Sequence, residues 1–181
     1  MSDYGGSNTP AEHKDTWQTP PELFAAINAE FSFQLDAAAS ERNALCRNFI
    51  TEEQDTLVTP WSDYVAIGYA WMNPPYSNPL PFVQKAAHEA EVNNIGCVML
   101  LPADQSVGWF KEAIKTASEV RCITGGRLSF ISSQSGKPVG GNTKGSMLII
   151  WRPYPRTQLI GTFVDKNTLM NFGAKLIARA A

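Results

Sequence analysis

The spacing of apolar and polar residues predicts a chain in which strands and helices alternate. Continuous apolar runs at 65–72 ("VAIGYAWM") and 95–101 ("IGCVMLL") are typical of strands buried on both faces of a sheet. Phe31, Phe33 and Leu35 alternate with polar residues, which predicts another strand ending at Asp36. Three further strands are expected at 119–123, 127–131 and 146–152.

Helix signals stand between these strands. Thr19 and Glu22 have the spacing of a capping box and Pro20 suits a first helical position, so a helix is predicted from Thr19 onward. Three more helices are expected, at about 79–91, 106–117 and 166–180. The alternation, followed by two strands around a glycine-rich loop, predicts an α/β fold with a mostly parallel sheet and a C-terminal antiparallel hairpin.

The chain is expected to hold a single domain over residues 16–181, preceded by a disordered polar arm at 1–15. With 181 residues, 44% of them hydrophobic, it can bury a sizeable core. No apolar run reaches the length of a membrane span, and the polar arm lacks the apolar segment of a signal peptide. Two histidines leave little for a metal site or a serine–histidine triad. Three cysteines without CxxC spacing fit a reducing cytoplasm.

The net charge of −2 conceals an uneven distribution. Residues 1–120 carry 6 basic and 16 acidic side chains, a balance of −10. Residues 121–156 carry 6 basic side chains and no acidic one. This asymmetry favours a face that binds a polyanion; the alternative is a solvated segment in which charges cluster by chance.

Residues 71–78, "WMNPPYSN", end the first buried run in an unusual way. Two prolines forbid further sheet hydrogen bonds, so the strand must stop and a stiff segment must follow. Asn73 is either a turn residue that bonds to nearby backbone or part of an active-site loop. In parallel α/β sheets, ligands gather at the carboxyl ends of strands, which favours the second interpretation.

Asp36 is expected at a second such strand end, followed by small residues that let a ligand approach the backbone. Its alternative is a helix N-cap. Asp55, between the two strand ends in sequence, is by itself typical of a solvated surface residue.

Several segments together carry a resemblance to a known family. The Asn-Pro-Pro-Tyr of 73–76 resembles the catalytic motif of S-adenosylmethionine-dependent amino-methyltransferases, which act on DNA adenine, RNA bases or glutamine in release factors. The ordered set resembles the small phage-type DNA N-6-adenine methyltransferases, often called Dam-like, from residue 15 to about 152. The set consists of "DTWQTPPELF" (15–24), "LDAAASERNALCRNFIT" (35–51), "WMNPPYS" (71–77), "VMLLPA" (98–103) and "GRLSF" (126–130). The chain departs from many methyltransferases in having "DAAAS" where they carry a glycine-rich loop.

The resemblance implies a Rossmann-like methyltransferase fold, S-adenosylmethionine as cofactor and adenine in DNA as substrate. The residues that it implies for cofactor binding are Thr19, Pro20, Asp36, Ala37, Ala38 and Asp55. Those that it implies for catalysis are Asn73, Pro74, Pro75 and Tyr76. The Asn73 side chain and the Pro74 carbonyl would each accept an N–H of the adenine amino group, and Tyr76 would stack on the flipped base.

Arg127, Lys137 and Lys144 are expected to bind DNA, the two lysines through its phosphates. The resemblance further implies a phage or prophage protein, a monomer or weak dimer, that acts in the bacterial cytoplasm without a metal. Two alternatives stay open: a methyltransferase for an RNA base or a protein glutamine amide, and a non-catalytic DNA-binding protein with a decayed methyltransferase fold.

Overall fold

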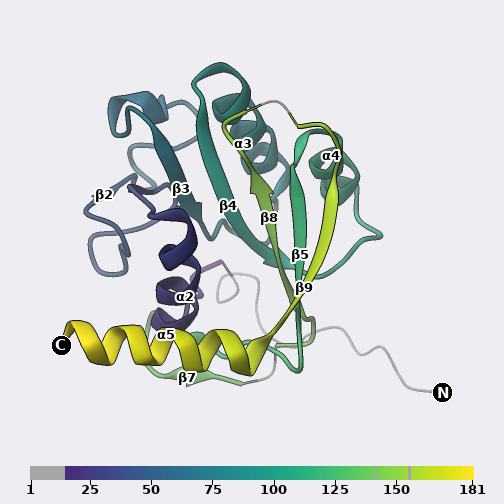
Figure 1. Cartoon of the computed structure of the whole chain (residues 1–181). Helices are drawn as coiled ribbons and strands as arrows, with labels where there is room; N and C mark the ends of the chain where they lie inside the picture. Colours follow the sequence, from purple (N-terminus) through teal and green to yellow (C-terminus); the bar gives the residue numbers. More distant parts are fainter. Residues whose placement is uncertain (1–14, 141, 155) are drawn as a thin grey trace.

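A seven-stranded sheet forms the centre of the chain in the computed structural model, which describes residues 15–140, 142–154 and 156–181 (Figure 1). Its strand order is β2-β1-β3-β4-β8-β5-β9. Neighbouring strands are parallel except at β8, which is antiparallel to both β4 and β5. The strands are β1 (Leu35–Asp36), β2 (Asn48–Phe49), β3 (Gly68–Met72), β4 (Ile95–Pro102), β5 (Glu119–Thr124), β8 (Ser146–Trp151) and β9 (Ile160–Asp165).

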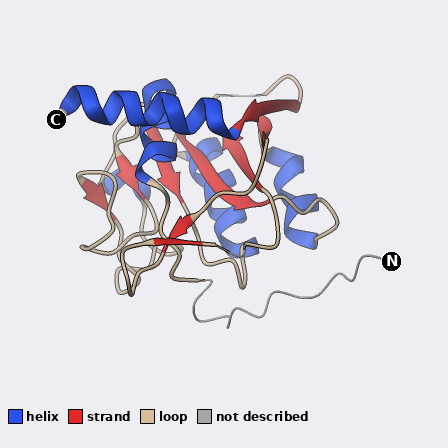
Figure 2. Cartoon of the chain, turned by 90° about the horizontal axis from the view of Figure 1, so that it is seen from below, coloured by secondary structure: helices blue, strands red, loops and turns tan. Residues whose placement is uncertain are grey.

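Helices cover both faces of this sheet. The helices are α2 (Pro21–Phe31), α3 (Leu80–Val92), α4 (Gly108–Thr116) and α5 (Lys166–Ala180), with a short 3-10 turn η1 (Trp61–Asp63). Figures 1 and 2 show α2 and α5 crossing on one side of the sheet, and α3 and α4 together on the other. The arrangement is therefore helix, sheet, helix in three layers.

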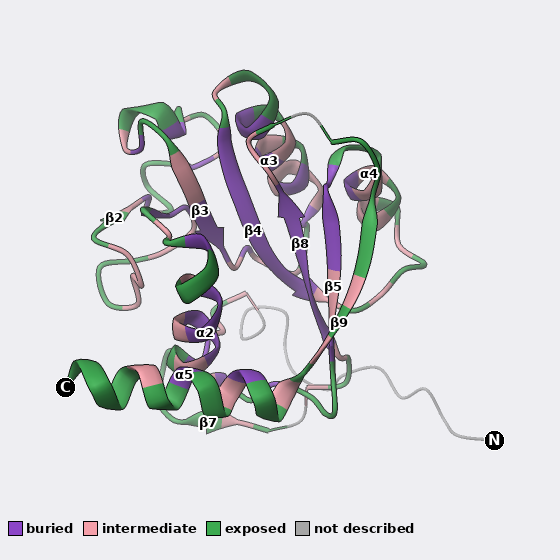
Figure 3. Ribbon diagram, viewed as in Figure 1, coloured by how far each residue is buried: buried purple, intermediate pink, exposed green. Residues whose placement is uncertain are grey.

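The continuous apolar run of β4 serves both layers. From Ile95 to Leu101 its odd-numbered residues pack in the core under α3 and α4, whereas Val98 and Leu100 pack in the core under α2 and α5. Side chains alternate across a strand, so a strand buried on both faces needs an apolar residue at every position. Figure 3 shows the central strands β4 and β8 buried along their length.

The predicted fold class, an α/β fold with a mostly parallel sheet and an antiparallel hairpin, is confirmed, although the hairpin is not formed by the two strands predicted at 127–131 and 146–152. The hairpin consists of β6 (Phe130–Ile131) and β7 (Pro138–Val139), and it lies below the carboxyl ends of the parallel strands in Figure 1. Residues 146–151 do not pair with β6. They enter the main sheet as β8, between β4 and β5.

The predicted start of the first helix is wrong by one residue. The helix begins at Pro21, its N-cap is Pro20, and no side chain caps it, so Thr19 and Glu22 do not form a capping box. Pro20 has an extended backbone with ψ 130°. A residue that precedes a proline is driven out of the helical region, so the second proline sets where the helix can begin.

Other element boundaries also differ from the prediction. Phe31 ends α2 instead of starting a strand, and β1 is only Leu35–Asp36. Ser106 does not cap α4, because its hydroxyl donates to the Asp104 carboxylate. Strand β9 was not predicted; it lies at the sheet edge and is largely exposed, so its apolar residues do not form a buried run.

The predicted arm at residues 1–15 lies outside the described residues except for Asp15. None of the helices in the described part of the chain is long and apolar enough to cross a membrane.

Candidate functional site

The carboxyl ends of β1 and β3 lie side by side. The two strands pair in parallel with Asp36 opposite Trp71, which places Asp36 next to the start of the 73–76 motif. A cavity of about 60 Å³ opens there. Its walls are residues 15–19, then Asp36, Ala38, Asn43 and Leu45, and lastly Trp71 and Asn73.

Asp36 is a buried carboxyl group with few partners. It is 3% exposed, and its Oδ2 accepts the Leu45 N–H at 3.0 Å. Burial raises the pKa of Asp36 to about 6, while hydrogen bonds from the backbone N–H groups of Leu45 and Ala38 act in the opposite direction. No helix follows Asp36 in the described residues before η1, so it is not a helix N-cap. A carboxyl group held this way is suited to accept hydrogen bonds from a ligand.

Asn73 bonds to a distant segment and not to its own turn. Its Nδ2 donates to the Trp17 carbonyl oxygen at 2.9 Å, across 56 positions of sequence. Its Oδ1 is buried and has no hydrogen-bond partner among the residues that the structure describes. The local bond that a turn residue would make is not seen in the described chain, so the site interpretation is favoured over the turn.

Tyr76 is the last residue of the 73–76 motif, and it packs against both the core under α3 and α4 and the core under α2 and α5. Its ring is half-buried and meets Phe130 edge to face, with 6.1 Å between ring centroids. The Tyr76 hydroxyl is buried without a partner in the described part of the chain, and burial raises the pKa of Tyr76 well above its ordinary value. Pro74 is buried and Pro75 half-buried, which fixes the backbone between Asn73 and Tyr76.

Trp71 is a site residue that the sequence did not single out. Its side chain is fully buried, and its Nε1 is a third polar atom with no partner among the described residues. All three such atoms lie within residues 71–76. Leaving a buried polar group unpaired costs about 1–3 kcal/mol, so Asn73 Oδ1 and Trp71 Nε1, whose residues line the cavity, point to groups that a ligand satisfies.

The other residues implied for the cofactor are only partly brought together. Thr19 and Ala38 line the cavity, whereas their sequence neighbours Pro20 and Ala37 are buried and do not line it. Asp55 does not line it: it is exposed in a turn with φ 53°, where its Oδ1 accepts the Leu57 N–H at 3.0 Å.

The basic residues of 121–156 do not form one face. Arg121 and Arg152 form ion pairs with Glu119 on the sheet. Arg156 donates to carbonyls at the carboxyl end of α4, near the start of β5 and therefore at the strand ends opposite the site. The interpretation of the whole segment as a polyanion-binding face is therefore wrong for these three.

The three residues expected to bind DNA lie in the half of that segment near the hairpin. Arg127 is exposed and donates to the Asn142 carbonyl at 2.9 Å. Lys144 forms an ion pair with Asp104. Lys137 lies in the turn between β6 and β7, and its ammonium group has no partner in the described ranges. Lys137 is thus the one of the three whose charge is available without breaking a contact.

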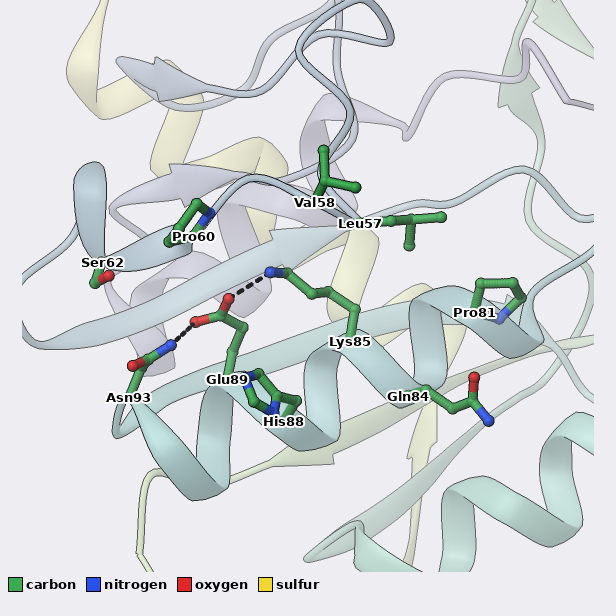
Figure 4. A pocket seen from close by; sticks show the side chains of 10 residues that line it. All are labelled: Leu57, Val58, Pro60, Ser62, Pro81, Gln84, Lys85, His88, Glu89 and Asn93. Atoms are coloured by element: carbon green, nitrogen blue, oxygen red, sulfur yellow. Dashed lines mark hydrogen bonds and ion pairs between the residues drawn. The ribbon is translucent and has the colours of Figure 1, made fainter.

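A second, larger cavity of about 600 Å³ lies between residues 57–62 and α3 (Figure 4). Its buried Glu89 is fully engaged: Lys85 lies 2.6 Å from Oε1, and Asn93 donates to Oε2 at 2.7 Å. None of the residues implied for catalysis or cofactor binding lines this cavity. The described residues contain no group of His, Cys, Asp and Glu that could hold a metal ion.

Comparison with known proteins gives consistent matches. A family model for DNA N-6-adenine-methyltransferase (Dam) matches residues 6–176. A DNA N-6-adenine-methyltransferase of Haemophilus phage HP1 (strain HP1c1) is 42% identical over 170 residues, which cover 92% of this chain and 96% of that protein. One of Escherichia phage T1 is 42% identical over 164 residues, 82% of this chain and 67% of that protein. A putative methyltransferase of Escherichia coli strain K12, YfdM, is 40% identical over 65 residues, 34% of this chain and 71% of that protein.

Proposed function

We propose, because the chain belongs to the DNA N-6-adenine-methyltransferase (Dam) family, that it transfers a methyl group from S-adenosylmethionine to the N6 amino group of adenine in DNA. The observation that carries the proposal is the buried Oδ1 of Asn73, which has no partner among the described residues and belongs to a residue that lines the same cavity as the buried Asp36. The first is an acceptor suited to an amino group, and the second suits a polar cofactor.

The cavity residues fit one end of such a cofactor. Asp36 can accept from amino or hydroxyl groups. Trp71 Nε1, which has no partner in the described ranges, can donate to an acceptor of the ligand. S-adenosylmethionine supplies a methyl group already activated on a sulfonium, so the protein needs no metal or covalent nucleophile. Ligand sites generally occupy several hundred Å³, so we assign the cavity of about 60 Å³ to a part of the cofactor.

The catalytic work of the chain is the orientation of the adenine amino group. That nitrogen is a poor nucleophile because its lone pair is delocalised into the ring. We propose that Asn73 Oδ1 and the Pro74 carbonyl each accept one of its N–H groups, which draws the nitrogen toward tetrahedral geometry. The bond from nitrogen to the methyl carbon would form as the bond from that carbon to sulfur breaks, leaving a neutral thioether, and the nitrogen would then release one proton to solvent. Pro74 and Pro75 hold the two acceptors in place beforehand, and such preorganisation lowers the barrier.

The DNA substrate is expected to meet the hairpin side of the site. Adenine N6 can be reached only if the base leaves the duplex, at a cost of a few kcal/mol. We propose that the Tyr76 ring offsets this cost by stacking on the base, and that Lys137 contacts a phosphate nearby. Two of the relatives are phage proteins, so we propose a phage or prophage role in a bacterial cytoplasm.

The test is incubation of the protein with labelled S-adenosylmethionine and unmethylated DNA, followed by mass spectrometry of the nucleosides. We expect N6-methyladenine, and about 10²–10³-fold slower formation of it with the Asn73→Ala variant under the same conditions. Matched RNA and a glutamine-containing protein serve as competing substrates. Label on either of these in place of DNA, or on cytosine, would contradict the proposal.

A further inference from the structure

Residues 15–18, which we call the strap, cross directly in front of the 73–77 turn. At one end, Asp15 Oδ1 accepts the backbone N–H of Ser77 at 3.0 Å. In the middle, the Trp17 carbonyl accepts from Asn73 Nδ2 at 2.9 Å. At the other end, Gln18 pairs with Ile131 of β6 through two backbone hydrogen bonds of 2.9 and 3.0 Å.

The contact in the middle determines which way the Asn73 amide points. A backbone carbonyl can only accept, so only the NH₂ end of the amide can face it. The oxygen end must then face the other way, where Oδ1 is buried and unpaired among the described residues. The terminal torsion of an asparagine is broad and roughly two-fold, so without this contact the amide could turn over and present a donor instead.

The Trp17 carbonyl is itself held firmly in place. The Trp17 ring stacks on Phe130 with 5.3 Å between centroids and 16° between planes. Phe130 is 1% exposed and belongs to the core under α2 and α5. The neighbouring Gln18–Ile131 pair fixes the backbone on the next residue.

We propose that the strap is a positioning element for methyl transfer: Trp17, through its carbonyl, holds the Asn73 amide with its oxygen toward the substrate amino group. Trp17 and Asp15 are positioning residues and do not take part in the chemistry. This inference rests on the proposed function, because it assigns Asn73 Oδ1 the task of accepting from adenine.

The test is a double-mutant cycle of Trp17→Ala and Asn73→Ala, measured as single-turnover methylation of adenine. Trp17→Ala should lower the turnover rate roughly tenfold, because small misplacements of reacting groups can cost up to about 10²-fold. Trp17→Phe should keep most of the rate, since a phenyl ring can still stack on Phe130. In the Asn73→Ala background, Trp17→Ala should cause no further loss, because the group that it orients is already gone.

Asp15 offers a variant at a half-buried position that does not endanger folding. Asp15→Ala releases the strap from Ser77 and should lower turnover, whereas Asp15→Asn keeps an acceptor oxygen and should restore it. A readout without ligand is the side-chain NH₂ signal of Asn73 in a ¹⁵N spectrum, identified by its loss in Asn73→Ala. Its exchange with solvent should accelerate in Trp17→Ala and stay slow in Trp17→Phe.

The failures can be told apart. If the unmodified chain forms no N6-methyladenine, or if Asn73→Ala is fully active, the proposed function or its mechanism is wrong. If the unmodified chain does form N6-methyladenine and Asn73→Ala does lose activity, additive losses in the double-mutant cycle would overturn the inference about the strap alone. It is equally overturned if Trp17→Ala weakens cofactor binding while leaving turnover unchanged.

Discussion

Tyr76 carries a polar atom that the described part of the chain leaves unsatisfied, so its contribution to stability can be separated from its proposed role in function. Its buried hydroxyl has no partner among the described residues, while its ring packs against both cores. A residue kept only for stability would be better without that hydroxyl. The ring and the hydroxyl can therefore be tested separately.

Tyr76→Phe should raise stability and keep most of the activity, because stacking on a base needs the ring and not the hydroxyl. Removing one unpaired buried group is worth about 1 kcal/mol, or about 2–4 °C in Tm for a chain of this size. Tyr76→Ala should lose both stability and turnover. Thermal melts and methylation assays on the two variants check this; a Tyr76→Phe protein that is stable but inactive would mean that the hydroxyl contacts a ligand.

Asn73→Ala should lower turnover by about 10²–10³-fold while S-adenosylmethionine affinity stays close to normal, because the lost contact is made to the substrate amino group. Turnover, a binding titration and a thermal melt together measure this. An Asn73→Ala enzyme with full activity would rule out the orientation mechanism and would favour the interpretation of Asn73 as a turn residue.

Asp36 predicts a pH dependence with a definite sign. Burial raises its pKa from 3.8 to about 6, so between these values the folded chain binds more protons at this carboxyl than the unfolded chain. The protonated carboxyl favours the folded state. The free energy of unfolding therefore falls by about 3 kcal/mol in total as the pH rises from below 3.8 to above 6. Asp36→Asn, which stays neutral and keeps an acceptor for Leu45, should have a higher Tm at pH 7.5 and a flatter profile.

The same ionisation should strengthen binding of a positively charged cofactor. Affinity for S-adenosylmethionine is expected to increase between about pH 5 and pH 7 in the unmodified chain. The Asp36→Asn variant should bind more weakly, with no such increase. Calorimetric titrations at several pH values compare the two; parallel profiles would mean that another group controls binding.

The sequence predicted where Asp36 and Asn73 lie because Asp36 ends one strand and Asn73 follows another, and small residues or prolines mark those two strand ends. The contact between Trp17 and Asn73 was beyond the sequence, since it joins residues 56 positions apart through a backbone carbonyl, which any residue could supply. Trp71 was hidden for another reason: within an apolar run, a tryptophan is typical of the core.

Helices α2 and α5 approach each other closely where they cross. A Cβ placed on Gly173 would lie 1.8 Å from the carbonyl oxygen of Glu22. Only glycine lets the two backbones come this near, although glycine weakens a helix by roughly 0.5–1 kcal/mol relative to alanine. The crossing therefore depends on one residue inside a helix that was predicted correctly over 166–180.

Gly173→Ala should lower Tm by several degrees despite its better helix propensity, because the helices must separate to accept the methyl group. Gly108→Ala is the matched control: Gly108 begins α4, and a Cβ there meets nothing within 4 Å. That variant should be neutral or slightly stabilising. Equal melting temperatures for the two variants would contradict the close approach.

The hairpin turn and the loop after it differ in the charge that they offer to DNA. Lys137→Ala should weaken DNA binding and reduce the slope of log affinity against log salt by about 0.9, the value for one phosphate contact. Lys144→Ala should have a smaller effect, since Lys144 must first leave Asp104. Lys115→Ala, on the exposed surface of α4, controls for net charge alone. Three identical slopes would place the DNA elsewhere.

The elements without a buried apolar run were the least predictable. Strand β1 has two residues and β9 is exposed, so neither carries the buried apolar run by which β3 and β4 were found. The prediction of a single basic face was wrong for a related reason. Strand β8 is antiparallel to β4, so Arg152, which follows β8, lies at the amino end of β4 and away from the site. The clustering of charged residues in a sequence does not predict at which end of a sheet each of those residues lies.

The position of β8 has a consequence for how the chain is made. A nascent chain emerging from the ribosome presents β4 and β5 long before β8, yet those two strands meet only through it. Until residue 151 is free, each exposes an unpaired apolar edge of the kind that recruits other chains. A chain truncated after residue 140 should therefore aggregate, whereas the chain of 181 residues should not; sedimentation of the two after translation in a cell-free system measures the difference.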